Sequence, residues 1–318
     1  MQLELLPCST KLACEVFNKA VHFQDPSYIS GGCNTLVEQT VGSVLDTVKT
    51  RVKIGVLPVN VAQGYHRGIQ ATSNGTWREF DVFGIVNALK GHTFTKIINN
   101  KMLIYGGVTS SGIISNFLYE LNYDNTTLTA QFGVGSVQPP PLMSHSAVFR
   151  KSTNELYILF GTTDGVVFNN LIYTYNIQLN IWSVIRPTGV IPENRTLQAV
   201  DIVDDNIYVF GGLYKDSVLK DFWIYSCREQ TWTQQFHPLS PLSAFGSSLV
   251  AVSQNKTLIL FGGTNGESKM NLQLWMYSIN SSNWMMLNPF GIPPKGFSQG
   301  SGVLLDSRRI LYTGGVSD

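Results

Sequence analysis

A repeat of about fifty residues is the feature of this sequence that most limits its fold. Short apolar runs end in glycine five times along the chain. The glycines that close these runs are Gly106-Gly107, Gly161, Gly211-Gly212, Gly262-Gly263 and Gly314-Gly315, and the first glycines are 55, 50, 51 and 52 residues apart. A period of this length is typical of β-propellers, whose blades are four-stranded sheets, rather than of helical or leucine-rich repeats.

Two further markers keep the same period. A tryptophan position recurs at Trp77, Leu128 (as a replacement), Trp182, Trp232 and Trp284. A tyrosine position recurs at Tyr119, Tyr173, Tyr225 and Tyr277. We expect the glycines to end the second strand of each blade, and the aromatic residues to lie on the third and fourth strands. There they would fill the space between blades, because aromatic side chains bury a large area.

These residues resemble the kelch repeat. The clearest copies are IYVFGG…DFWIYSCREQTW at 207–232 and LILFGG…LQLWMYSINSSNW at 258–284. The resemblance covers roughly residues 70 to 315 and implies an all-β fold, a kelch-type β-propeller related to the central domain of galactose oxidase. It says little about activity, because one fold serves many functions.

Six repeats of about 52 residues fill the 318 of the chain, which predicts a single six-bladed domain over 1–318. One degenerate blade would take its second strand from VKIG (52–55), its third from 64–72 and its fourth from 75–82. The last blade would be closed by N-terminal strands at 12–18 and 20–24. Closure of the ring removes exposed sheet edges, which otherwise invite aggregation.

Composition argues against several classes of protein. The net charge is +1 and only 14% of residues are charged, so a nucleic-acid surface is not expected. No apolar run approaches the twenty residues of a membrane span. Residues 1–20 lack the apolar core of a signal peptide, which favours the cytoplasm over secretion.

The four cysteines, Cys8, Cys14, Cys33 and Cys227, contain no C-x-x-C pair, so no zinc site is predicted. Disulfides such as Cys8–Cys14 and buried thiols both remain open.

Catalytic patterns are sparse. His92 and His145 lie 53 residues apart, at the opening of the first strand in two successive repeats. Their recurrence indicates a role in the architecture, and the alternative is that both imidazoles face the mouth of the central channel as general bases near pH 7. No catalytic triad, nucleotide-binding glycine motif or metal-ligand cluster stands out. We therefore predict no catalytic residue, no cofactor and no bound metal.

Two enzyme families with related propellers supply the alternative function. The copper oxidases use a Tyr-His pair, and Tyr65-His66 is the only such dipeptide here. The bacterial sialic-acid mutarotases are kelch proteins of similar size. Under this alternative the chain is a carbohydrate-active enzyme or a sugar-binding propeller, resembling a sialic-acid mutarotase more than a copper oxidase, with carbohydrate as its ligand.

The leading interpretation is a non-enzymatic scaffold that binds a protein partner through one face of the ring. Loops held by a rigid frame often carry binding residues. The loops after each glycine marker and the loops between blades should share a face, because strands alternate in direction. Candidate contacts on these loops are Tyr214, Lys215, Asp216, Asn265, Glu267, Arg195, Phe245 and Phe297. The alternative for each is a solvated loop side chain.

Overall fold

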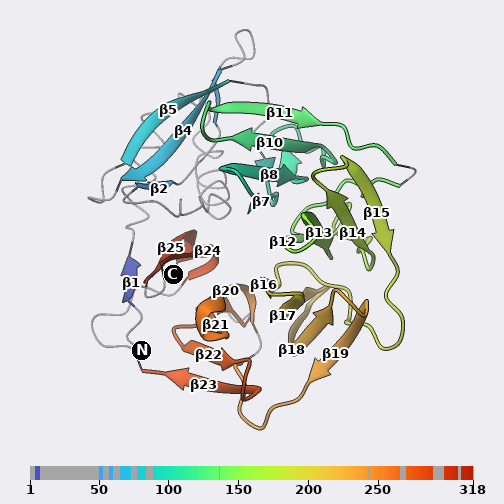
Figure 1. Ribbon diagram of the computed structural model, residues 1–318. Helices are drawn as coiled ribbons and strands as arrows, with labels where there is room; N and C mark the ends of the chain where they lie inside the picture. The colour runs from blue at the N-terminus through green and yellow to red at the C-terminus, as the bar shows by residue number, and fades with distance from the viewer. Residues whose placement is uncertain are drawn as a thin grey trace.

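The protein is an all-β structure whose strands form a ring of small sheets (Figure 1). The computed structural model describes residues 4–7, 50–52, 57–59, 65–72, 77–83, 89–135, 137–242, 244–265, 270–288, 297–306 and 309–317. Within these residues the one helical element is a short 3₁₀ turn, η1 (Ser253–Asn255). The all-β propeller expected from the repeat is confirmed.

Four complete blades follow one another, each with four antiparallel strands in chain order, and the outer strand of blade A also pairs with a strand of the preceding sheet. Blade A consists of β7 (Thr93–Lys96), β8 (Lys101–Tyr105), β10 (Leu118–Asn122) and β11 (Thr127–Gln131). Blade B consists of β12 (Ser146–Arg150), β13 (Glu155–Leu159), β14 (Ile172–Asn176) and β15 (Ile181–Ile185). Blade C consists of β16 (Ala199–Val203), β17 (Asn206–Tyr214), β18 (Ser217–Ser226) and β19 (Thr231–Gln235). Blade D consists of β20 (Phe245–Val252), β21 (Thr257–Thr264), β22 (Leu274–Ser278) and β23 (Asn283–Leu287).

The tryptophan marker lies on the fourth strand of blades B, C and D, as predicted. Trp182, Trp232 and Trp284 are all buried. Each lies opposite a tyrosine of the third strand, and the ring centroids are 4.9, 4.9 and 5.1 Å apart for Tyr175, Tyr225 and Tyr277. In blade A a pair of leucines, Leu121 and Leu128, takes the place of both rings.

The tyrosine positions predicted for blades A and B are each two residues too early. In blade A, Tyr119 lies opposite Ala130 and Leu121 holds the marker position. Tyr173 lies opposite Val184, and Tyr175 is the residue that meets Trp182. Residues two apart on a strand share a face of the sheet, so both tyrosines fit the period and spacing alone does not separate them.

The glycine alignment in blade B also shifts by one residue. Gly161 corresponds to the second glycine of the pairs, Gly107 and Gly212, because all three donate their N–H to the following interblade loop. Phe160 therefore occupies the place of the first glycine, and it does so with φ of +59°. A phenylalanine in this left-handed region is strained by roughly 1–3 kcal/mol, and its burial against Trp232 offsets that cost.

The hydrophobic core lies between blades rather than inside one. Leu103 and Tyr105 of blade A pack with Leu156 and Trp182 of blade B in one buried cluster. Equivalent clusters join blade B to blade C and blade C to blade D. The ring is thus held together by apolar contact between neighbouring sheets, as in other propellers.

The remaining strands form partial sheets. β24 (Phe297–Asp306) and β25 (Arg309–Ser317) form a hairpin after blade D, and β1 (Glu4–Pro7) pairs with β25. An N-terminal strand therefore joins the last sheet, as expected, but it is residues 4–7 and it runs parallel to its neighbour. No hairpin connects this strand to β25, so no turn imposes the antiparallel direction. The strands predicted at 12–18 and 20–24 lie outside the described residues.

The degenerate blade is represented by β2 (Thr50–Val52), β4 (Tyr65–Thr72) and β5 (Trp77–Phe83), with β3 (Leu57–Val59) also on β4. The third and fourth strands match the prediction, and the second lies slightly earlier than 52–55. A two-stranded ladder pairs β6 (Leu89–Lys90), which precedes blade A, with β9 (Val108–Thr109), which lies between β8 and β10. Four blades are complete among the described residues, and the count of six stays a prediction.

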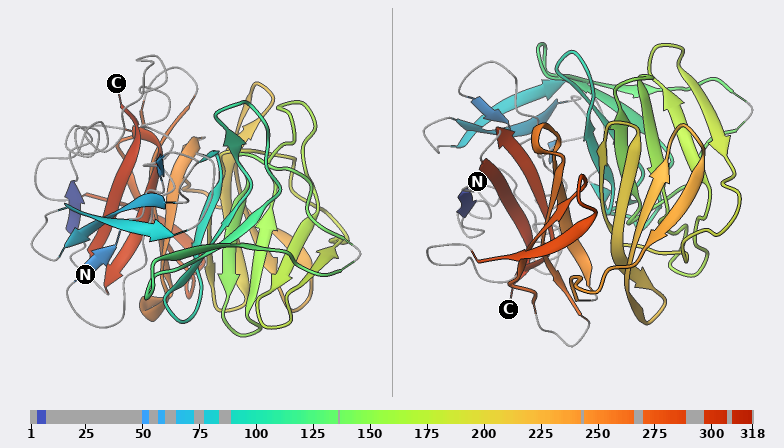
Figure 2. Two further views of the ribbon diagram at one scale, coloured as in Figure 1. Left: turned by 90° about the horizontal axis from the view of Figure 1, so that it is seen from above. Right: turned by 60° about the horizontal axis from the view of Figure 1, so that its bottom comes forward.

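The ring has an inner wall and two faces. The first strands, β7, β12, β16, β20 and β24, surround the centre and run along the axis of the ring (Figures 1 and 2). We call the side formed by the turns between first and second and between third and fourth strands the hairpin face. The loop face is the opposite side, formed by the segments after the glycine markers and the interblade loops that enter each first strand.

Candidate functional site

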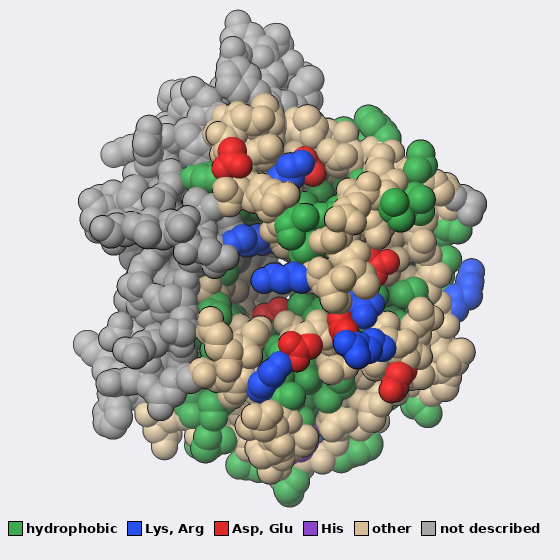
Figure 3. Space-filling model, in the orientation of Figure 1, with side chains coloured by type: hydrophobic (Ala, Val, Ile, Leu, Met, Phe, Trp, Pro, Cys, Tyr) green, Lys and Arg blue, Asp and Glu red, His purple; other side chains and the backbone are tan. Residues whose placement is uncertain are grey.

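A cavity of about 700 Å³ occupies the centre of the ring. Its wall is formed by the first strands of blades A to D and by β24. Figure 3 shows the central hollow with Lys or Arg side chains near it, and Lys90, Lys96 and Lys151 are among the lining residues. The cavity is large enough for a small ligand.

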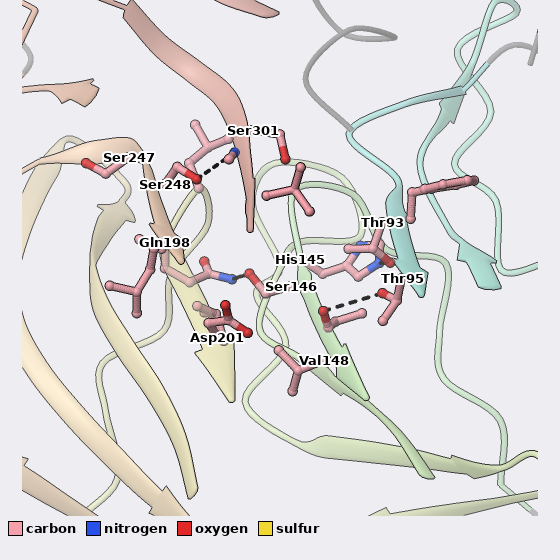
Figure 4. A pocket seen from close by; sticks show the side chains of 18 of the residues that line it. Thr93, Thr95, His145, Ser146, Val148, Gln198, Asp201, Ser247, Ser248 and Ser301 are labelled. Carbon is pink, nitrogen blue, oxygen red and sulfur yellow. Dashed lines mark hydrogen bonds between the residues drawn. The ribbon is translucent and has the colours of Figure 1, made fainter. Parts of the chain in front are cut away.

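Several polar side chains along this wall form hydrogen bonds to the neighbouring blade (Figure 4). Thr93 Oγ1 lies 2.9 Å from His145 Nε2 and joins blade A to blade B. Gln198 Nε2 donates to Ser146 Oγ at 2.7 Å and joins blade C to blade B. These side chains therefore hydrogen-bond within the protein and hold neighbouring blades together, as is usual for buried polar groups.

The same kind of link continues around the wall. The Gly302 N–H donates to Ser248 Oγ at 2.8 Å, between β24 and blade D. The Ala251 N–H donates to Asp201 Oδ2 at 2.7 Å, between blades D and C. Burial raises the pKa of the Asp201 carboxyl to about 6, although its hydrogen bonds from Ala251 and Ile202 oppose that shift.

His92 and His145 occupy equivalent places at the openings of β7 and β12, and both are buried. A Cβ on Gly107 would lie 2.8 Å from the Cβ of His92, and one on Gly161 would lie 2.6 Å from that of His145. The Cβ of each histidine thus packs under the glycine of its own blade, and the His145 ring contacts Tyr105 of blade A with centroids 5.3 Å apart. This packing supports the architectural interpretation.

Both rings are neutral at pH 7. Burial lowers the pKa of His92 to about 4, and burial together with the nearby His92 lowers that of His145 to about 3. His92 Nδ1 is 3.1 Å from the Leu89 carbonyl oxygen. His145 lines the cavity, but its Nε2 is already engaged by Thr93.

The described residues contain no group of three or more His, Cys, Asp or Glu side chains arranged to hold a metal ion. Cys227 is a buried free thiol, and burial raises its pKa to about 11. Cys8, Cys14 and Cys33 lie outside the described residues, as does any pairing between them. No helix in the described part of the chain is long and apolar enough to span a membrane.

The loop face is built by backbone hydrogen bonds between its two kinds of loop. The N–H groups of Gly107, Gly161 and Gly212 donate to the carbonyl oxygens of Leu142, Arg195 and Ala244, at 2.7, 3.0 and 2.9 Å. The acceptors all belong to interblade loops. The prediction that the loops after the glycines share a face with the interblade loops is confirmed.

Gly106 is one position where only glycine fits this arrangement. Its φ is +68°, and a Cβ there would lie 2.4 Å from the Leu142 carbonyl oxygen. Any side chain would therefore push the interblade loop away from the blade.

Two neighbouring loops meet in an aromatic patch. Tyr214 of blade C packs edge-on against Phe168 of blade B, with ring centroids 5.0 Å apart. Lys215 Nζ lies 5.2 Å from the Tyr214 centroid, as a cation–π contact. Val166 and Val167 beside them are 79% and 57% exposed. We call these five residues the loop patch.

Arg195 lies inside the protein rather than on its surface. Its side chain is fully buried and forms a bidentate ion pair with Asp221, at 2.7 and 2.8 Å, and donates to the Gly211 carbonyl oxygen at 3.0 Å. Burial alone would raise the pKa of Asp221, but the bonds from Arg195 and Trp223 hold it below its usual value. Arg195 thus anchors the loop face from beneath.

The other predicted contacts are dispersed. Asp216 and Asn265 are exposed on loops, and Phe245 is half-buried at the start of β20. Phe297 begins β24, and Glu267 lies outside the described residues. The structure brings only Tyr214 and Lys215 into a cluster, with Asp216 as their neighbour in the chain.

Sequence reasoning missed Val166, Val167 and Phe168. The signal was present in GTTDGVVFNN, where two valines and a phenylalanine follow an Asp-Gly turn. Apolar residues in such a turn have no strand to bury them, which marks them as candidates for contact.

The two faces differ in the apolar side chains that they expose. In the described residues, the first-to-second-strand turns contain no large exposed hydrophobic residue, and the third-to-fourth-strand turns contain Leu179 alone. The segments after the glycines contain Ile113, Phe117, Val166, Val167 and Leu272, and the interblade segments contain Phe132, Val134, Val190, Ile191, Phe236, Leu239 and Leu242. Of the interblade residues, Phe132 and Val134 lie beside the Asn180 turn of blade B, so the segments after the glycines carry the contrast with the hairpin face. Concentrations of exposed apolar side chains mark binding surfaces.

A comparison with known families agrees with the fold. The family described as the KLHDC2/KLHL20/DRC7 Kelch-repeats domain matches residues 72–315. Domains of this kind bind proteins.

Curated relatives are similar over part of the chain. Tip elongation aberrant protein 3 of Schizosaccharomyces pombe is 24% identical over 225 residues, which is 60% of this chain and 20% of that protein. Acyl-CoA-binding domain-containing protein 4 of Arabidopsis thaliana is 25% identical over 203 residues, or 63% of this chain and 30% of that protein. Multiple epidermal growth factor-like domains protein 8 of Mus musculus is 26% identical over 163 residues, or 49% of this chain and 6% of that protein. The chain thus spans under a third of the length of each of these relatives, and the family match over most of its residues places it in the Kelch-repeat family.

Proposed function

We propose that the chain is a protein-interaction scaffold that binds its partner through the loop face, with the loop patch at the centre of the contact. The observation that carries this proposal is the concentration of exposed apolar side chains on loops of that face. The hairpin turns on the other side expose almost none. An aromatic residue flanked by apolar groups and a cation is the kind of cluster that dominates binding energy at interfaces.

The loop patch has the properties of a preorganised contact. Tyr214 is held by Phe168 of the neighbouring blade, and the glycines hydrogen-bond the loops to the interblade segments. Loops fixed in this way lose less conformational entropy when a partner binds. Lys215 and Asp216 at the edge supply charges of both signs, which suits a partner surface with a mixed polar rim.

The test compares one variant on each face. The tagged chain, the patch variant Val166→Lys/Tyr214→Ala and the hairpin-face control Leu179→Lys are used to capture proteins from cell extract, followed by mass spectrometry and affinity measurement on the captured protein. We expect the patch variant to lose affinity by about tenfold or more, since central aromatic residues contribute at least ~2 kcal/mol. The control should bind like the parent. Binding that survives in the patch variant and is lost in Leu179→Lys contradicts the proposal.

The same variants, tested on a glycan array, distinguish a carbohydrate ligand from a protein partner. A sugar would occupy the central cavity, where Ser247, Ser248 and Ser301 line the wall. Binding to a glycan array that is unaffected by the patch variant would favour that alternative over a protein partner.

A further inference from the structure

The outer strands of the four complete blades differ in how their free edges are covered. The edge of β15 is bridged by Val134, whose N–H donates to the Asn180 carbonyl oxygen at 2.8 Å and whose carbonyl oxygen accepts from the Trp182 N–H at 3.0 Å. Thr188 forms a parallel bridge to Thr231 on β19, and Phe83 forms one to Thr127 on β11. In the described residues no such bridge reaches β23.

The sequence explains why no described residue bridges β23 in this way. Val134 is the third residue after β11 ends, and Thr188 is the third after β15 ends. The third residue after β19 is Pro238. Proline has no N–H, so it cannot donate the hydrogen bond that Val134 donates.

β23 also presents apolar side chains at this uncovered edge. Met285 and Met286 are 49% and 44% exposed. The residues at the place of Met285 on β15 and β19 are the polar Ser183 and Thr233. β23 contains no charged residue, whereas proteins usually protect an edge strand with charges, proline or a bulge. The strand in Figure 1 lies at the outer rim of the ring.

Comparison with the equivalent strand β15 shows which backbone N–H and C=O groups of β23 point away from blade D. Asn180 and Trp182 use outward-facing groups for the bridge to Val134, and their counterparts on blade D are Ser282 and Trp284. Because backbone groups alternate along a strand, those of Met286 also face outward.

We propose that β23 pairs in antiparallel fashion with β23 of a second copy of this chain. A two-fold axis at Met285 places Trp284 opposite Met286 of the other copy, so that the outward-facing groups of both strands bond to each other. Met285 then lies opposite its own counterpart. A symmetric contact of this kind sets the residue on the two-fold axis against its own copy, so a charge there would repel its like, and β23 has the uncharged Met285 at that position.

The size of the strand sets the strength of the pairing. Five residues from each copy bury much less than the roughly 1,200–2,000 Å² of a stable interface. We therefore expect a weak dimer, with a dissociation constant on the order of tens of micromolar.

Sedimentation velocity of the full chain from ~1 to ~300 µM brackets that affinity. The parent should shift from monomer to dimer, and Met285→Lys/Met286→Lys should remain monomeric because like charges then face each other. The matched control Thr233→Lys/Gln234→Lys changes the corresponding positions of the covered strand β19 and should dimerise like the parent. A parent that stays monomeric, or a dimer that survives in the methionine variant, overturns the proposal.

Cysteine cross-linking tests the register. In the proposed pair the two Met285 Cα atoms are directly opposite, within the range that a disulfide spans. Met285→Cys should form a covalent dimer under mild oxidation, above the level of the parent. Asn283→Cys, which lies opposite Leu287 of the other copy, should not. Equal cross-linking by both variants, or by neither, contradicts this register.

Discussion

The loop face and the hairpin face of the ring use polar groups in different ways. On the loop face the Arg195 side chain is fully buried beneath the loops in its ion pair with Asp221, while apolar side chains face solvent. On the hairpin face two ion pairs join blades directly. Arg150 of blade B bonds to Asp205 of blade C, and Lys256 of blade D pairs with Asp204 of blade C. One side of the repeat therefore locks blades together, and the other supports loops whose sequences vary.

The largest effect on stability is expected from breaking the buried ion pair between Arg195 and Asp221. In Asp221→Ala the guanidinium of Arg195 loses its partner in a site without solvent, so unfolding should require about 3–5 kcal/mol less free energy. Urea denaturation measures this. Lys256→Ala on the hairpin face removes an exposed pair and should cost under ~1 kcal/mol. Equal effects of the two variants would remove the distinction between the faces.

The second-largest loss of stability is expected where the loop after the glycines approaches the interblade loop. Gly106→Ala forces a Cβ to within 2.4 Å of the Leu142 carbonyl oxygen at φ of +68°, and should destabilise the protein by at least ~2 kcal/mol. Gly112 lies further along the same loop at φ of +81° with no atom within 4 Å, so Gly112→Ala should cost only ~1 kcal/mol from backbone strain. Thermal melts of both variants make the comparison. A larger loss in Gly112→Ala would contradict the close approach of the two loops.

A smaller effect than that of Gly106→Ala is expected on the hairpin face, and it depends on pH. Hydrogen bonds from Arg150, Ser152 and Arg228 hold the pKa of Asp205 well below its usual range. A depressed folded-state pKa gives stability that is present above the unfolded value, about 3.9, and lost as pH falls through the folded value. Asp205→Asn should therefore lower stability at pH 7 by on the order of 1 kcal/mol, and the difference should shrink below pH 4.

The exposed neighbour Asp204 supplies the control for this titration. Its side chain is 67% exposed, so Asp204→Asn should change stability little at any pH. Denaturation curves between pH 3 and 7 for the parent and both variants provide the measurement. A difference for Asp205→Asn that is constant across this range would show that its carboxylate does not act through these bonds.

The sequence was sufficient for the elements that repeat. Glycine recurs because the chain must leave the second strand at the same point in every blade. Tryptophan recurs because the same space between blades must be filled, so Trp182, Trp232 and Trp284 identify the fourth strands. Period alone does not resolve a two-residue ambiguity on one face of a strand, which is why Tyr173 was chosen in place of Tyr175. It also does not show that Phe160 replaces a glycine, since that depends on a backbone angle.

The candidate site was only partly predictable for a related reason. Arg195 is a charged residue in a loop, and sequence gives no sign that Asp221, 26 residues later, draws it inside. The contact of Tyr214 with Phe168 crosses from one blade to the next, over 46 residues of chain. Contacts between blades depend on how the sheets twist against each other, and no local pattern records that geometry.

The most direct test of the central claim is hydrogen–deuterium exchange of the parent chain with and without a captured partner. We expect new protection of backbone amides in 106–117, 161–171 and 211–220, with the turns at 151–154 and 253–256 unchanged. Protection confined to those hairpin turns, with free exchange in the loops around Val166 and Tyr214, would contradict this expectation.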